Sequence, residues 1–149
     1  MSSKSIKILI FFVVIIALLA FFMHFFSEYK EMSVILGGKK YSVLVARTTN
    51  QLTKGLSGRV SLGQDEGMLF EFRESRKYGF WMKDMSFPLD IIWISDDNKI
   101  VHIEKSLATS TYPKIFYPEN IARYVLEINA GELEKLNIKI GDSVGFFKK

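Results

Sequence analysis

Three short apolar runs between Met68 and Ser95 constrain the fold more than any other part of this chain. They are residues 68–72 (MLFEF), 78–82 (YGFWM) and 89–94 (LDIIWI). Each run has the length of a β-strand and is rich in aromatic or branched residues, and polar or turn-forming residues separate one run from the next. The pattern predicts three strands at the centre of a β-rich core, and we expect any functional site to lie near them. The second strand is expected over residues 79–83, after a charged loop of residues 73–77. The third run, apolar on both faces except for Asp90, suits a strand covered on both sides.

Turn and helix signals divide the rest of the chain into further short strands. Gly37-Gly38 lies between two apolar runs and predicts a tight hairpin turn. Thr48 or Thr49 can cap a short helix that ends near Gly55 or Gly58. A second helical turn is expected over residues 131–136, and residues 96–99 (DDNK) read as another hairpin turn. Together these signals predict a mainly β (α+β) domain, a compact barrel or sandwich with one or two short helices.

The N-terminus predicts a single transmembrane helix. An almost continuous apolar run extends from Ile8 to Phe26, broken only by His24. As a helix the run would be ~28 Å long, about the thickness of a bilayer's hydrocarbon core. Lys4 and Lys7 precede it, and no excess of positive charge follows it. The positive-inside rule therefore places the N-terminus in the cytoplasm and the main domain outside. A cleaved signal peptide is the competing interpretation, although its apolar region would be shorter.

We accordingly divide the chain into residues 1–31, which hold the cytoplasmic tip, the anchor and a short link, and an extracytoplasmic domain over residues 32–149.

The composition excludes several functions for that domain. The chain has no cysteine, which excludes disulfides and thiol nucleophiles. With only two histidines in the chain, we expect no metal site and no cofactor. The net charge of +4 is spread without a basic stripe, so nucleic acid is not an expected partner.

Five segments in this order and spacing resemble the family named domain of unknown function 192. The segments are 55–59 (GLSGR), 66–72 (EGMLFEF), 80–85 (FWMKDM), 88–94 (PLDIIWI), and 124–131 (YVLEINAG) with Gly141-Asp142. The resemblance covers roughly residues 40–147. It implies a compact, mainly β domain of prokaryotic proteins that often follows a signal or anchor segment, and it implies no established reaction.

Six residues are candidates for ligand binding. Trp81 and Lys83 share one strand face and can line a pocket. Asp90 begins an apolar run, where it can act as an acid or pair with Lys83 as a structural lock. The remaining candidates are an arginine after a glycine-rich turn and two carboxylates near strands: Arg59, Glu66 and Glu127.

These residues leave three functional hypotheses open. The first is a membrane-anchored module that binds a ligand or another envelope protein, with a peptide or a glycan as possible partners. The second is a metal-independent enzyme that uses Lys83 with Asp90 or Glu66 as base and acid. The third is a structural partner that docks through the aromatic loop of residues 107–119.

Overall fold

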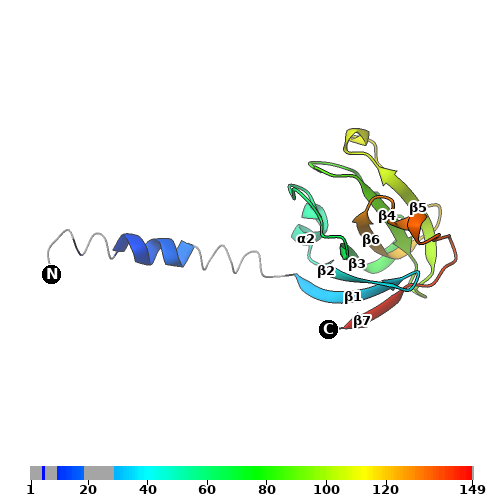
Figure 1. Ribbon diagram of the computed structural model, residues 1–149, viewed down its shortest axis with the longest axis horizontal. Coiled ribbons are helices and arrows are strands. Elements are labelled where there is room, and N and C mark those ends of the chain that lie inside the picture. The colour runs from blue at the N-terminus through cyan, green and yellow to red at the C-terminus, as the bar shows by residue number, and fades with distance from the viewer. Residues whose placement is uncertain (1–4, 6–9, 19–28, 149) are drawn as a thin grey trace.

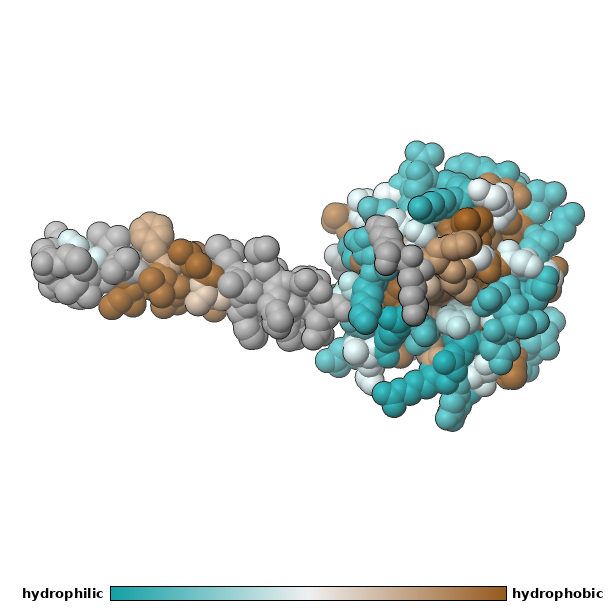
Figure 2. All heavy atoms as spheres, turned by 90° about the horizontal axis from the view of Figure 1, so that it is seen from below, coloured by the Kyte–Doolittle hydropathy of each residue, from teal (hydrophilic) through white to brown (hydrophobic). Residues whose placement is uncertain are grey.

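The computed structural model describes Ser5 and residues 10–18 and 29–148 (Figure 1). Residues 10–18 are helical, and their apolar side chains are mostly exposed, as the brown spheres of Figure 2 show. Within the described residues, no helix has both the length and the apolar character that crossing a membrane requires. The two ends of the predicted span, Ile8 and Phe26, lie outside the described residues. The transmembrane helix therefore stays a prediction.

Residues 30–148 form one seven-stranded sheet with strand order β5-β4-β6-β3-β2-β1-β7. All neighbouring strands are antiparallel except β2 and β3, which run parallel. The strands are β1 (Lys30–Leu36), β2 (Lys39–Ala46), β3 (Glu66–Arg76), β4 (Leu89–Ile94), β5 (Ile100–Leu107), β6 (Ala122–Asn129) and β7 (Gly145–Lys148). The predicted mainly β (α+β) fold is confirmed.

The sheet curves until its two outer strands approach each other (Figure 1). Lys99, just before β5, forms an isolated bridge with Ser143, just before β7. The backbone N–H of Ile100 donates to Asp142 O at 2.9 Å, and that of Val144 donates to Asn98 O at 2.9 Å. These bonds pair backbone groups that would otherwise be left at exposed sheet edges.

Both faces of the central strands are buried. In β3, Leu69 packs into one apolar cluster, whereas Met68 and Phe70 pack into a second cluster on the opposite face. In β4, Ile92 belongs to the first cluster and Trp93 to the second, as the two-residue period of a strand requires. The apolar run over residues 89–94 is therefore a strand covered on both sides, as predicted.

The predicted turns and short helices are present. Gly37 and Gly38 join β1 to β2 with φ values of 56° and 80°, which a residue with a Cβ rarely adopts. The short helix α2 (Thr49–Lys54) begins at a capping box, in which the Thr48 side chain and the Gln51 side chain bond each other's backbone N–H. The second helical turn is α3 (Glu132–Lys135), and a 3-10 turn, η1 (Thr109–Thr111), lies in the predicted aromatic loop.

The prediction of a strand over residues 79–83 is wrong. This segment crosses one face of the sheet, and its only β-type pairing is the isolated bridge between Phe80 and Phe116. The two residues exchange backbone hydrogen bonds of 2.9 and 2.8 Å. Phe80 and Met82 are buried against the sheet while Trp81 points outward, so the run alternates like a strand without joining the sheet. Strand β3 meanwhile continues to Arg76, through most of the predicted charged loop.

A buried carboxylate fixes α3 to the sheet. Glu132 accepts hydrogen bonds from Lys39 Nζ at 2.6 Å, from the Tyr41 hydroxyl at 2.7 Å and from Lys135 Nζ at 2.9 Å. These bonds, the one from Lys39 above all, lower the pKa of Glu132 to about 2. A buried charge with this many partners is a structural anchor.

Candidate functional site

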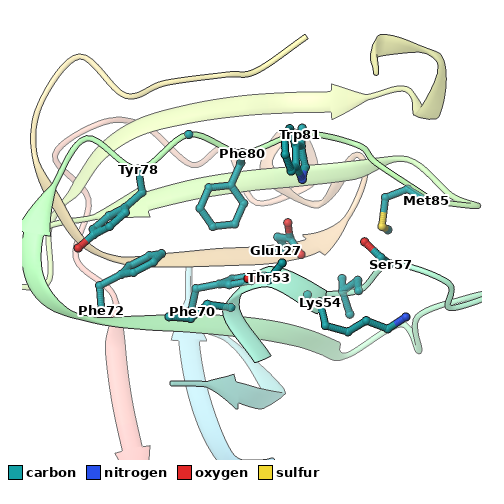
Figure 3. Close-up of a pocket in the computed structure, with 14 residues that line it drawn as sticks. Thr53, Lys54, Ser57, Phe70, Phe72, Tyr78, Phe80, Trp81, Met85 and Glu127 are labelled. Carbon is teal, nitrogen blue, oxygen red and sulfur yellow. The ribbon is translucent and has the colours of Figure 1, made fainter. Parts of the chain in front are cut away.

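A pocket of about 130 Å³ opens on the face of the sheet that the segment of residues 78–85 crosses (Figure 3). Its walls come from α2 and the turn that follows it, from β3, from this crossing segment and from β6. Figure 3 shows the Glu127 carboxyl group in the middle of the pocket, between Trp81 on one side and Thr53 on the other. The pocket thus combines an acid with apolar walls.

Glu127 occupies a buried position in the middle of the sheet, where apolar side chains are normally found. Strand β6 lies between β3 and β4, and Glu127 pairs with Met68 on one side and Ile91 on the other. Val125, two residues earlier on the same face, is fully buried. Glu127 is therefore at the centre of the sheet, with its side chain on the apolar face beneath the crossing segment.

One oxygen of the buried Glu127 carboxyl group has no hydrogen-bond partner among the described residues. The residue is 5% exposed, and the oxygen without a partner is Oε2. Removal from water disfavours the ionised form, and burial raises the pKa of Glu127 to about 8. Buried polar groups are normally paired, because an unpaired one costs free energy of folding. A buried carboxyl group that lacks a partner and faces a pocket is therefore a candidate functional residue.

Aromatic rings form most of the inner wall. Phe72 and Tyr78 stack with ring centroids 3.5 Å apart, and Phe70 meets Phe80 edge-to-face at 4.8 Å. Trp81 is 45% exposed and lies at the mouth, edge-on to Tyr112 at 6.3 Å. Because these rings contact one another, the walls are held in place before any ligand binds.

Two hydrogen bonds hold the turn after α2 against the crossing segment. The Ser57 hydroxyl donates to Lys83 O at 2.9 Å, and the backbone N–H of Gly58 donates to Asp84 O at 2.9 Å. Thr53 and Lys54, at the end of α2, are exposed residues of the pocket wall.

The structure brings together two of the six predicted ligand-binding residues, Trp81 and Glu127, which both line the pocket. Lys83 is exposed and does not line it. Glu66 is exposed and accepts a hydrogen bond from the backbone N–H of Gly63 at 3.1 Å. Arg59 is half-buried and places its positive charge near Tyr29.

Asp90 is a structural residue rather than part of the pocket. It is fully buried, its Oδ1 accepts the backbone N–H of Ser106 at 2.7 Å, and its Oδ2 accepts that of Leu133 at 2.8 Å. Among the ion pairs of the described residues, none joins it to Lys83. The expected Lys83–Asp90 pair is therefore wrong, because backbone donors from β5 and α3 already satisfy both carboxylate oxygens.

Sequence reasoning missed the contribution of α2 and most of the aromatic wall. The pocket residues it did not single out include Leu52, Thr53, Lys54, Phe70, Phe72 and Met85. Most of these aromatic residues look like ordinary core residues in the sequence. In the sequence Glu127 alternates with Leu126 and Ile128 as a solvent-facing residue of a strand does, and only the structure shows that this face of β6 is covered. In the described part of the chain, no group of three or more histidine and carboxylate side chains could hold a metal ion.

Comparisons with known proteins agree with this fold. The family model of DUF192, described as an uncharacterized ACR, matches residues 32–146. A solved structure from Sinorhizobium meliloti 1021, named as a candidate transcription regulator, is 31% identical with a TM-score of 0.73. The match covers 79% of this chain and 95% of the other. No protein with a curated description matches the chain.

A second solved structure, a protein of unknown function from Novosphingobium aromaticivorans DSM 12444, is 30% identical with a TM-score of 0.68. The match covers 78% of this chain and 84% of that protein. Since 95% of the Sinorhizobium chain is matched, the chain in that solved structure consists of little more than this domain. A fragment of residues 29–149, which retains every strand of the described residues, is thus a suitable unit for experiments.

Proposed function

Because the chain belongs to the DUF192 family, whose description names no activity, we propose a function from its own pocket: a membrane-tethered module that binds a small organic ligand at Glu127. The observation that carries the proposal is the partnerless Oε2 of Glu127 inside an aromatic pocket. A ligand that gives this oxygen a hydrogen bond would remove the cost of burying it alone. Convergence of a few polar groups with apolar walls is typical of small-molecule sites.

A peptide or a glycan that carries the bound group also fits this site. The exposed aromatic surface continues from Trp81 at the mouth to Tyr112 and Tyr117, which are 46% and 57% exposed. Aromatic residues that are partly exposed and already in contact are common where proteins bind larger molecules. The loop of residues 107–119, which the third hypothesis assigns to docking a partner, supplies both tyrosines.

The alternative of a metal-independent enzyme has less support from the geometry. Lys83, Asp90 and Glu66 do not line the pocket, so they do not form an acid–base pair there. Glu127 has the raised pKa of a general acid. The described pocket wall, however, contains no second carboxylate that could serve as a base or a nucleophile. We therefore place binding ahead of catalysis.

A bulky side chain at the pocket wall tests the binding site. We expect fragments from a library of neutral, cationic and anionic molecules to shift the NMR signals of Trp81 and Met85 in residues 29–149. Thr53→Trp, an exposed position of α2 that lines the pocket, should abolish these shifts by obstructing access to Glu127. Asn50→Trp, an exposed position of the same helix that does not line the pocket, is the matched control. Binding that survives Thr53→Trp would rule out the pocket as the site.

The membrane tether rests on the apolar run from Ile8 to Phe26 and on the lysines before it. We expect the full chain to remain in the membrane fraction after an alkaline carbonate wash, whereas residues 29–149 stay in the supernatant. In intact spheroplasts, protease added outside should remove the domain. A full chain that the wash releases, or a domain that the protease does not reach, would contradict the tether or its orientation.

A further inference from the structure

The pocket offers a ligand one uncommitted buried polar group. Besides Glu127, its polar side chains are those of Thr53, Lys54, Ser57 and Tyr78, together with the indole N–H of Trp81 at the exposed mouth. Ser57 donates its hydroxyl hydrogen to Lys83 O at 2.9 Å, and Tyr78 donates its own to Glu74 O at 2.8 Å. Thr53 and Lys54 are exposed at the wall. Within the described wall, a ligand group that reaches the buried interior therefore meets a hydrogen-bond acceptor and no buried cation.

The walls have the electrostatic character that suits a cation. The face of an aromatic ring carries partial negative charge, so cations are attracted to it within about 6 Å of the ring centroid. Five aromatic residues line the pocket: Phe70, Phe72, Tyr78, Phe80 and Trp81. A carboxyl group among such rings is complementary to a positively charged group with small apolar substituents.

The size of the pocket limits this group. A volume of about 130 Å³ corresponds to about four water molecules in the liquid. This is enough for an ammonium group with a few carbon atoms, while the remainder of a larger ligand would extend past Trp81 into solvent.

Building on the proposed function, we propose that the ligand presents a small organic ammonium group, which donates a hydrogen bond to Glu127 Oε2 while the aromatic walls enclose its carbon atoms. The ligand class is thus an alkylamine, free or as the end of a larger molecule. An anionic group would be repelled by ionised Glu127.

The charge state of Glu127 gives this proposal a distinct pH dependence. The other titratable groups of the pocket wall are Lys54 from α2 and Tyr78 from the crossing segment, and β3 and β4 contribute none. No ion pair joins Lys54 to Glu127 among the described residues. With its pKa raised to about 8, Glu127 is protonated at pH 6 and half ionised at pH 8. An alkylammonium ion must displace that proton, so its affinity should rise about 50-fold from pH 6 to pH 8.

The experiment compares three probes of similar size with residues 29–149: n-butylammonium chloride, 1-butanol and sodium butyrate. NMR titrations at pH 6, 7 and 8 measure each affinity. We expect butylammonium to bind most tightly at pH 8, to lose most of its affinity at pH 6 and to lose its pH dependence in Glu127→Gln. The affinity of butanol should not rise with pH.

Other outcomes overturn the inference in ways that separate it from the proposed function. If butanol or butyrate binds more tightly than butylammonium and Thr53→Trp abolishes that binding, the pocket is a binding site but not for cations. Butylammonium binding that is independent of pH, or unchanged in Glu127→Gln, also overturns the cationic class. If Thr53→Trp weakens the binding of no probe and no library fragment, the proposed binding site itself is wrong.

Discussion

Replacing Asp90 with alanine is expected to lower the free energy of unfolding by about 3–5 kcal/mol. The fully buried carboxylate accepts the backbone N–H groups of Ser106 and Leu133 at 2.7 and 2.8 Å. Alanine would leave both N–H groups without an acceptor and create a small cavity. Urea denaturation of residues 29–149, followed by circular dichroism, measures the change.

Two further variants make the Asp90 prediction specific. Asp90→Asn should also destabilise the domain, because one carboxylate oxygen is replaced by an NH₂ group that faces an N–H donor. Asp96→Ala, in an exposed turn after the same strand, should change the free energy by less than about 0.5 kcal/mol. An Asp90→Ala domain as stable as the wild type would show that Asp90 does not anchor the fold and would return it to the candidates for function.

Replacing Glu127 with glutamine is expected to raise the free energy of unfolding by about 3 kcal/mol at pH 7. The pKa of Glu127 is about 8 in the folded domain, against 4.5 for an unperturbed glutamate. In the unfolded chain Glu127 is ionised at pH 7, so folding must take up a proton and is disfavoured. This penalty is absent below about pH 4.5, grows as the pH rises towards 8 and is constant above that. Glutamine cannot ionise, so the Glu127→Gln domain folds without this free-energy penalty.

The pH dependence separates this effect from a simple change in packing. The free energies of the wild type and Glu127→Gln should be similar near pH 4.5 and should diverge by about 1.4 kcal/mol per pH unit between pH 5 and pH 8. For Glu119→Gln, the same substitution at an exposed position, the difference in free energy of unfolding from the wild type should stay constant over this pH range. A constant difference across this range would mean that the pKa of Glu127 is not raised. A residue that destabilises the fold in this way is more readily explained by function than by structure.

The fold was largely predictable because its signals are local. Alternation marked β6 and most of β3, the continuous apolar run marked β4, and Gly37, Gly38 and Thr48 marked a hairpin and a helix start. Residues 79–83 misled the prediction, since a segment that lies across a sheet alternates buried and exposed side chains as a strand does. The parallel pairing of β2 with β3 was not predictable, because it depends on tertiary packing.

The site was only partly predictable because it depends on contacts between residues distant in the sequence. Trp81 and Glu127 were candidates from residue type and position, but their meeting in one pocket depends on the strand order. The expected partnership of Lys83 with Asp90 rested on closeness in the sequence, whereas Asp90 bonds to Ser106 and Leu133, 16 and 43 residues away. The sequence did not indicate the burial of Glu127, because it alternates with Leu126 and Ile128 as an exposed residue does, and only the segment that crosses the sheet covers its face.

The most direct test of the central claim is the titration of the Glu127 side chain itself. The δ-carboxyl carbon can be followed by NMR in residues 29–149 labelled with ¹³C-glutamate, and Glu127→Gln assigns the signal by its loss. We predict that this carbon titrates with a midpoint of about 8. A midpoint near the ordinary glutamate value of 4.5 would show that the carboxyl group is solvated or already paired, and it would contradict the claim that the pocket holds an unpartnered acid ready for a ligand.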